Sequence, residues 1–290
     1  MKILIIGKNS YIGNHISEWL IKDGYDVDQL DSLSSVWKTF DYSQYSTIVH
    51  VAGIVHQPRC KDWELYRRVN AEMPIEIAIM AKAQGVKQFI LLSTMAIYGI
   101  EKKMTTNVIN NNTPLIPSGM YGKSKLMAEE GLMELDDELF NVVIVRPPNV
   151  YGYGCRGGYI PGFVRIAQLL PIIPQINDSV RQSFIYIDNL CELIRLIIAN
   201  KLKGIFCPQD DKSVSANELL FIISNILGVK YRSSRILGMI IQLFKFLPIV
   251  NKVYGGVEYS RELSSIEGLK YVIVPFNEGM RMTLQDDKNI

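Results

Sequence analysis

The sequence predicts an α/β fold, a doubly wound parallel sheet with a smaller substrate domain interleaved with its C-terminal part. Short apolar runs that suit buried strands alternate with helical patterns through about residue 150, which is typical of a parallel sheet with helices on both faces. The Gly- and Pro-containing stretch 152–178 then interrupts this rhythm. With 290 residues and 48% hydrophobic content, the chain can bury a large core in one interleaved unit.

The N-terminal segment predicts a strand, a turn and a helix. Residues Lys2–Ile6 form a buried-strand run that stops at Gly7, and a helical pattern follows Gly13. Such a unit can hold a pyrophosphate, because its glycines permit close backbone approach and the start of the helix offers free N–H groups. The next strand, 25–30, ends in Asp31, where a carboxylate can bind the ribose hydroxyls of a dinucleotide.

A second candidate site lies at the end of a later strand. Phe89–Leu92 is a short continuous apolar run, as a strand buried on both faces requires. Ser93 and Thr94 follow it. Ligands of open parallel sheets bind outside the carboxyl ends of the strands, so a hydroxyl here can hydrogen-bond both a substrate oxygen and the Tyr121 phenol. The alternative interpretation is that the two hydroxyls only satisfy backbone groups at the end of the strand.

The most informative pair is Tyr121 and Lys125, in a helix predicted to begin near Ser118. Residues four apart on a helix share one face. A free phenol has a pKa of about 10, and a nearby cation favours its ionised form. Such a pair can donate or accept a proton near neutral pH, although two unrelated surface side chains would have the same spacing. Glu129 and Glu130, further along the helix, are expected to be exposed.

Together these segments resemble the extended short-chain dehydrogenase/reductase family, the Rossmann-like nucleotide-sugar epimerases, dehydratases and reductases. The resemblance covers nearly the whole chain. The family's Gly-x-x-Gly-x-x-Gly turn is matched at Gly7 and Gly13, with Ser10 at the middle position, and its Tyr-x-x-x-Lys pair is matched by Tyr121 and Lys125. Further matches are the strand and turn 48–53, Asn70 in the following helix, Thr94 before Tyr98-Gly99, the Arg-Pro-Pro segment 146–152 and the segment 181–190.

The resemblance implies a role for each residue. Tyr121 would be the general acid/base, Lys125 would lower its pKa and hold the nicotinamide ribose, and Thr94 would orient the sugar. The implied substrate-binding residues are Thr94, Met95, Asn149 and Arg181, the last pairing with the nucleotide diphosphate. The implied cofactor-binding residues are Gly7, Asn9, Ser10, Tyr11, Ile12, Gly13, Asp31, Asp41, Val51, Ala52, Gly53, Asn70, Tyr121, Lys125 and Pro148. NAD is expected because Asp31 would repel a 2′-phosphate, with NADP as the alternative because Lys8 could attract one.

Two departures from the family's pattern narrow the expected reaction. Met95 and Ala96 follow Thr94 where 4,6-dehydratases carry an acid and a base, which disfavours dehydration. The connection from Asp31 to the strand starting near Thr47 is short, which suggests a less enclosed cofactor. We therefore expect a reductase that acts on the 4-keto group of a UDP-linked N-acetyl 6-deoxy-hexose for surface polysaccharide synthesis. The alternatives are a UDP-hexose 4-epimerase with tightly bound NAD and, more remotely, a non-catalytic NAD(P)-binding regulatory protein.

The chain is expected to divide into a cofactor domain (1–152 and 186–207) and a substrate domain (153–185 and 208–290). Helices are predicted near 162–170, 188–200 and 215–227, the last with a capping box at Ser215 and Glu218, and a strand over 204–207. The apolar segment 236–247 is too short and too interrupted to span a membrane. It predicts a helix packed on the core or on a partner subunit, with peripheral membrane attachment as the alternative.

Composition and charge exclude several other classes of protein. A formal net charge of +2 without a basic cluster gives no reason to expect a nucleic-acid partner. The four cysteines and three histidines show no disulfide or metal-ligand spacing, so no metal is expected, and His56 is assigned no chemistry. The strand at the very start leaves no room for a signal peptide, which predicts a cytoplasmic enzyme. The resemblance also implies a homodimer through the helices carrying 60–84 and 118–135.

Overall fold

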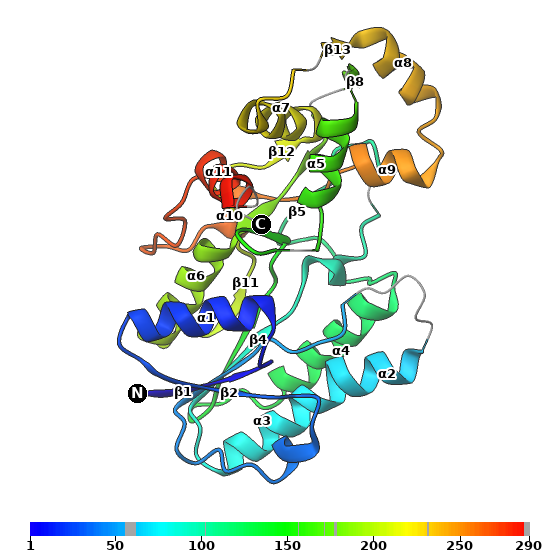
Figure 1. Cartoon of the computed structure of the whole chain (residues 1–290). Helices are drawn as coiled ribbons and strands as arrows, with labels where there is room; N and C mark the ends of the chain where they lie inside the picture. Colours follow the sequence, from blue (N-terminus) through cyan, green and yellow to red (C-terminus); the bar gives the residue numbers. More distant parts are fainter. Residues whose placement is uncertain are drawn as a thin grey trace. The chain divides into compact units, whose positions relative to one another are not determined.

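The computed structural model describes residues 1–55, 62–101, 103–155, 157–170, 172–176, 179–230 and 232–286 (Figure 1). His56 and Cys60 lie outside the described residues. The chain forms two compact units. Unit 1 comprises Met1–Gly99, Pro114–Pro147 and Leu190–Pro208, and unit 2 comprises Ile100–Thr113, Pro148–Asn189 and Gln209–Ile290. Residues 100–113 thus group with unit 2, whereas the sequence analysis assigned them to the cofactor domain, whose boundaries remain a prediction.

Unit 1 contains a six-stranded sheet in which every neighbouring pair is parallel, which confirms the predicted fold class. The strand order is β11-β6-β4-β3-β1-β2. The strands are β1 (Lys2–Ile6), β2 (Asp26–Leu30), β3 (Thr47–His50), β4 (Gln88–Leu92), β6 (Asn141–Val145) and β11 (Gly204–Phe206). The order reverses between β1 and β3, and this switch point is where open α/β sheets bind their ligands.

The strands of unit 1 are apolar on both faces because helices cover both faces. Leu4, Ile48 and Leu91 join one core cluster with residues of α3 and α4, while their neighbours Ile3 and Val49 are equally buried. The helices of this unit are α1 (Tyr11–Lys22), α2 (Trp63–Arg67), α3 (Met73–Ala83), α4 (Met120–Met133) and most of α6 (Ile187–Ala199), together with the π-turn η2 (Arg68–Glu72) and the 3-10 helices η1 (Ser35–Lys38) and η3 (Met95–Tyr98).

The connection between β2 and β3 is as short as the sequence indicates. Residues 31–46 contain η1 and no strand. Phe40 in this connection stacks on Tyr45, with ring centroids 5.9 Å apart, and Asp41 accepts a hydrogen bond of 3.0 Å from Ser43 N. Tyr45 also belongs to the core cluster of unit 1, so this connection packs onto the unit.

Unit 2 is built from short strands and surface helices around an aromatic core. Tyr151, Phe184 and Phe276 have ring centroids 5.5–6.1 Å apart. Asp210 is fully buried beside them and accepts hydrogen bonds from Tyr151 Oη, Tyr186 N and Asn189 Nδ2 at 2.8–2.9 Å. This carboxylate therefore ties the paired strands that carry Tyr151 and Tyr186 to the start of the helix that carries Asn189.

Unit 2 contains four two-stranded sheets, which pair β7 with β10, β9 with β12, β8 with β13 and β5 with β14. Ser215 caps α7 as predicted, since its Oγ accepts a hydrogen bond of 3.1 Å from Glu218 N. Within the described ranges, no helix is both long and apolar enough to cross a bilayer. The remaining elements are β5 (Val108–Ile109), β7 (Asn149–Tyr151), α5 (Ile160–Leu169), β8 (Ile172–Pro174), β9 (Arg181–Gln182), β10 (Phe184–Tyr186), β12 (Val214–Ser215), α7 (Ala216–Leu227), β13 (Arg232–Ser234), α8 (Arg235–Leu243), α9 (Pro248–Tyr254), β14 (Glu258–Tyr259), α10 (Arg261–Ser264) and α11 (Phe276–Asp286).

Candidate active site

The turn after β1 adopts the backbone geometry of a phosphate cradle. Gly7 has φ +130°, and a Cβ added there would lie 2.7 Å from Val51 Cγ2, so only glycine fits. Asn9 is left-handed at φ 64°. Ser10, which replaces the family's middle glycine, is the N-cap of α1 and accepts a hydrogen bond of 3.1 Å from Gly13 N. The start of a helix carries a positive potential, which favours an anion such as a phosphate at this position.

The residues predicted to hold the rest of a dinucleotide surround this turn within unit 1. Asp31 is exposed directly after β2, and its Oδ1 accepts a hydrogen bond of 2.8 Å from Leu33 N. Val51 and Ala52 follow β3, and both donate backbone hydrogen bonds of 3.0 Å to Ile6 O. A glycine turn, a helix start and an exposed carboxylate are what an NAD pyrophosphate and ribose need, so the residues present fit this cofactor.

Tyr121 and Thr94 are brought together as the sequence predicts. Thr94 ends the segment after β4, and its Oγ1 accepts a hydrogen bond of 3.2 Å from Ala96 N. Its hydroxyl is also close to the Tyr121 phenol, where it opposes the rise in the pKa of that phenol. Helix α4 can approach this segment because Gly122 has no Cβ, which would lie 2.7 Å from Ala96 O. The phenol and the hydroxyl therefore sit at the carboxyl end of a central strand.

The pKa of Tyr121 shifts in the direction opposite to the expected one. Burial raises the pKa of the phenol, and the hydrogen bond from Thr94 opposes this shift. The sequence predicts instead that the charge of Lys125 lowers the pKa of Tyr121. Helical spacing shows that the two side chains share a face, but the balance between desolvation and charge depends on the surrounding tertiary packing.

Lys125 is a buried amine with only 3% of its surface exposed. Its Nζ donates a hydrogen bond of 2.9 Å to Leu92 O, the last carbonyl of β4. Burial lowers its pKa to about 8, although the Glu129 carboxylate opposes the shift. Burial and the charge of Lys125 also lower the pKa of His50 to about 3, so His50 is neutral.

Asn70 ties the loop after β3 to helix α4. Its Oδ1 accepts a hydrogen bond of 2.7 Å from Ile54 N, and its Nδ2 donates to Ile54 O at 2.9 Å and to Ser124 Oγ at 3.1 Å. Gly53 in this loop lies against both Asn70 Oδ1 and Lys125 Nζ. Asn70 therefore positions the loop and the Lys125 helix, and its predicted contact with the cofactor stays a prediction.

A buried polar network next to the pair escaped the sequence analysis. Glu129 was expected to be exposed, and this expectation is wrong, because only 3% of Glu129 is exposed. Its carboxylate pairs with Arg146, with Nη2 and Oε2 2.6 Å apart, and accepts a short hydrogen bond from Ser93 Oγ. Arg146 Nη1 donates a hydrogen bond of 3.0 Å to Tyr98 Oη. The sequence contains a clue to the burial of Glu129, because this residue lies four positions after Lys125 and therefore shares its helix face.

Pro148, Asn149 and Arg181 belong to unit 2, and their roles remain predictions. Asn149 Nδ2 donates a hydrogen bond of 3.4 Å to Ser183 O. The Arg181 guanidinium pairs with Glu218 at 3.0 Å and donates a hydrogen bond of 3.2 Å to Ser213 Oγ. A diphosphate bound at Arg181 would have to share the guanidinium with the Glu218 carboxylate.

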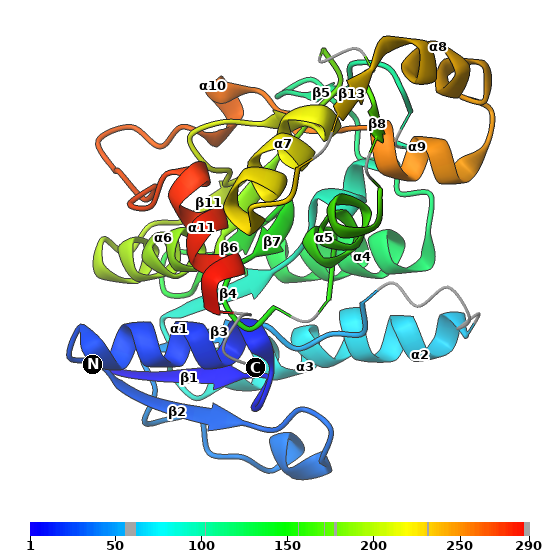
Figure 2. The ribbon, with the colours of Figure 1, turned by 45° about the horizontal axis from the view of Figure 1, so that its top comes forward.

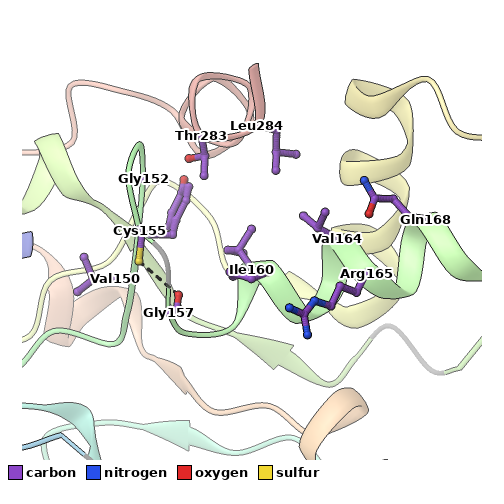
Figure 3. Close-up of a pocket in the computed structure, with 12 residues that line it drawn as sticks. Val150, Gly152, Cys155, Gly157, Ile160, Val164, Arg165, Gln168, Thr283 and Leu284 are labelled. Carbon is purple, nitrogen blue, oxygen red and sulfur yellow. Dashed lines mark hydrogen bonds between the residues drawn. The ribbon is translucent and has the colours of Figure 1, made fainter. Parts of the chain in front are cut away.

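Unit 2 also contains a cavity of about 230 Å³ beside β7 and α5 (Figure 3). Figure 3 shows Ile160, Val164, Arg165 and Gln168 projecting from α5, with Thr283 and Leu284 of α11 opposite. The cavity combines an apolar wall with a few polar groups, as binding sites for small molecules do. The sequence analysis did not select α5 or α11 residues, because their patterns resemble those of any amphipathic helix.

Comparisons with known proteins identify the family of this chain. A family model described as "NAD dependent epimerase/dehydratase family" matches residues 3–206. The chain is 25% identical to an N-acetyl-alpha-D-glucosaminyl-diphospho-ditrans,octacis-undecaprenol 4-epimerase of Escherichia coli O157:H7, over 93% of this chain and 82% of that one. It is 27% identical to UDP-arabinose 4-epimerase 1 of Arabidopsis thaliana, over 53% of this chain but only 44% of the relative.

The fold has solved counterparts over its whole length. MoeE5, solved in complex with UDP-glucose and NAD, superposes with a TM-score of 0.75 at 17% identity, covering 100% of this chain and 99% of that one. The family model spans more than half of the chain and includes the phosphate turn, Thr94, Tyr121 and Lys125. The chain therefore belongs to the NAD dependent epimerase/dehydratase family.

Proposed function

We propose that this protein is an NAD-dependent 4-epimerase of a diphosphate-linked sugar, in which Tyr121 is the general acid/base. The observation that carries the proposal is the Tyr121 phenol beside the Thr94 hydroxyl at the end of β4, with the buried Lys125 amine on the same face of α4 as Tyr121. The two sequence relatives described above are 4-epimerases, one of a UDP-sugar and one of an undecaprenol-linked sugar. They support the epimerase ahead of the 4-keto reductase that the sequence analysis ranked first.

Three residues of unit 1 bind or transfer the protons of the proposed reaction. NAD, when bound, supplies a carbon that accepts and returns a hydride. The Thr94 hydroxyl, which accepts from Ala96 N, donates toward the phenol and holds it at the end of the strand. Tyr121 takes the proton from the sugar hydroxyl as the carbinol is oxidised and gives it back on reduction. Lys125, with a pKa lowered to about 8, can carry charge beside the ribose or yield a proton near neutral pH.

The residues after Thr94 argue against dehydration. Met95 and Ala96 begin η3, and neither side chain can accept or donate a proton. Elimination across two sugar carbons needs a second acid or base beside the phenol. Epimerisation and ketone reduction need only one acid/base group, and Tyr121 provides it.

The test is turnover without added reductant. Purified protein is incubated with UDP-N-acetylglucosamine, with UDP-glucose and with polyprenyl-diphosphate-linked N-acetylglucosamine, and the sugar configuration is followed by proton NMR. We expect the 4-epimer to form from at least one of these substrates without added NADH, and Tyr121→Phe to abolish this turnover while NAD binding persists. Tyr25→Phe, a change in a half-buried tyrosine directly before β2, is the matched control and should remain active.

The 4-keto reductase remains the competing candidate because residues 31–46 contain no strand to cover the cofactor. An epimerase retains its NAD through each cycle, whereas a reductase must release it. Denaturation followed by quantification of the released nucleotide separates the two. One NAD per chain supports the epimerase, and nucleotide-free protein that oxidises NADH only with a 4-keto-6-deoxy sugar would reverse the assignment.

A homodimer through α3 and α4 is part of the proposal. The two helices pack closely, because Gly131 of α4 lies against Ile75 of α3. Both helices expose apolar side chains beyond this contact, at Ile79, Met127 and Met133. Sedimentation equilibrium of Met127→Glu against wild type tests the interface, since a charge at its centre should dissociate a dimer built on these helices.

A further inference from the structure

Helix α8 has its apolar face directed away from the unit that carries it. Ile236, Met239, Ile240 and Leu243 recur at positions i, i+3, i+4 and i+7, and all four are exposed. The opposite face carries the buried Gly238, and α8 packs there on strand β8. An amphipathic helix of a globular protein normally turns its apolar stripe toward the core. This stripe faces outward instead.

The same surface continues past the end of the helix. Phe244, Phe246, Leu247 and Ile249 are also exposed, so eight large apolar side chains between residues 236 and 249 are 37–74% exposed. We call these eight residues the apolar ridge. The eight residues lie in α8, in α9 and in the turn that joins the two helices, which are neighbours in Figures 1 and 2. Contiguous exposed apolar surface of this kind marks an interaction site.

The charged residues that neighbour the apolar ridge in the sequence all have one sign. Lys230, Arg232, Arg235, Lys245 and Lys252 lie in or beside it, and no Asp or Glu occurs between Glu218 and Glu258. The other parts of the chain hold 26 Lys and Arg against 29 Asp and Glu. The whole net positive charge of the protein therefore comes from this one segment.

We propose that the apolar ridge docks on the surface of an anionic lipid bilayer. A helix with apolar residues on one side and cations along its edges lies in the plane of the interface, with its apolar face among the acyl chains and its cations at the phosphates. α8 has nine residues and Lys245 and Pro248 follow it, so the segment lies on a membrane and does not cross it.

The charges argue against a second copy of this chain as the partner of the ridge. A two-fold interface between two copies would place this cationic segment against itself, and like charges across an interface disfavour association. Charged residues are also depleted at the centres of protein interfaces, whereas Lys245 lies within the ridge. An anionic bilayer presents phosphate anions above an apolar layer, so it matches both the cations and the exposed apolar side chains of the ridge.

The test is flotation of the full chain with lipid vesicles. We expect the protein to float with vesicles of phosphatidylcholine and phosphatidylglycerol, to float poorly with phosphatidylcholine alone, and to dissociate at high salt. Leu243→Gln should weaken binding about tenfold through lost apolar burial, and Arg235→Gln about fivefold through one lost cation. The matched controls Leu139→Gln and Lys203→Gln change exposed residues of unit 1 and should bind like wild type.

A second measurement requires no variant. Hydrogen–deuterium exchange of the wild-type protein should slow over residues 235–250 when anionic vesicles are added. Protein that stays at the bottom of the gradient with anionic vesicles, or equal binding by Leu243→Gln and Leu139→Gln, would overturn the proposal. So would exchange protection over 235–250 that depends on protein concentration and not on lipid, because it would assign the ridge to self-association.

Discussion

The buried amine of Lys125 should destabilise the fold at neutral pH, and its removal should therefore stabilise the protein. Its pKa falls from 10.5 to about 8. Each pKa unit corresponds to about 1.4 kcal/mol, so the penalty for burying the protonated amine is about 3 kcal/mol at pH 7. Lys125→Met removes this penalty but also removes the hydrogen bond to Leu92 O, which costs about 1 kcal/mol. The variant should be more stable by about 2 kcal/mol at pH 7.

The sign of the pH dependence follows from the two pKa values. The unfolded chain holds this proton up to about pH 10.5, whereas the folded chain releases it near pH 8. The wild type is therefore penalised below pH 8 and recovers stability as the pH rises toward 10.5. By pH 10 the penalty is only about 1 kcal/mol, so wild type and Lys125→Met should then be about equally stable.

Denaturant unfolding of nucleotide-free protein at pH 7 to pH 10 measures this difference. Tryptophan fluorescence is a suitable signal because all three tryptophans, Trp19, Trp37 and Trp63, lie in unit 1 with Lys125. Lys123→Met changes an exposed lysine of the same helix and should give a difference that does not vary with pH. If the Lys125→Met difference were equally flat, the amine would not be desolvated and the reasoning would fail.

Three further predictions concern the same unit. Glu129→Gln should lower the unfolding free energy by about 3–5 kcal/mol, because it leaves Arg146 as an unpaired buried charge, and urea titrations should show that adding Arg146→Met recovers part of the loss. Ser10→Ala should cost about 1 kcal/mol by removing the α1 cap, whereas Ser10→Gly should cost only a few tenths; equal losses in urea titrations would show that the cap contributes nothing. Gly7→Ala should cost about 1–3 kcal/mol of stability because φ is +130° there, and calorimetry should show weaker NAD binding, since the added Cβ meets Val51.

Much of the fold could be predicted from local patterns. Strands such as Lys2–Ile6 and Phe89–Leu92 are continuous apolar runs, and a strand covered by helices on both faces requires this pattern. The Tyr121–Thr94 pairing was also predictable, because a hydroxyl after a parallel strand and a phenol on the next helix meet at the same edge of a sheet.

The parts that were missed depend on packing between distant segments. Glu129 has the sequence context of an exposed residue, and it is buried because Arg146, 17 residues later, supplies the opposite charge. Arg181 matches a phosphate-binding segment and its role there stays a prediction, but the local pattern could not show that it pairs with Glu218, 37 residues away. Asp210 carries no sequence signal, although three distant groups of unit 2 hydrogen-bond its carboxylate.

By itself the sequence determined the parallel sheet, the phosphate turn, the candidate Tyr121–Lys125–Thr94 site and the cationic apolar segment, since each depends on the spacing and type of residues close together in the chain. Only the tertiary structure decided which charges are desolvated and which side of α8 faces outward. The physical reason is that burial and pairing depend on atoms contributed by segments far apart in the chain, and these determine the raised pKa of Tyr121 and the lowered pKa of Lys125.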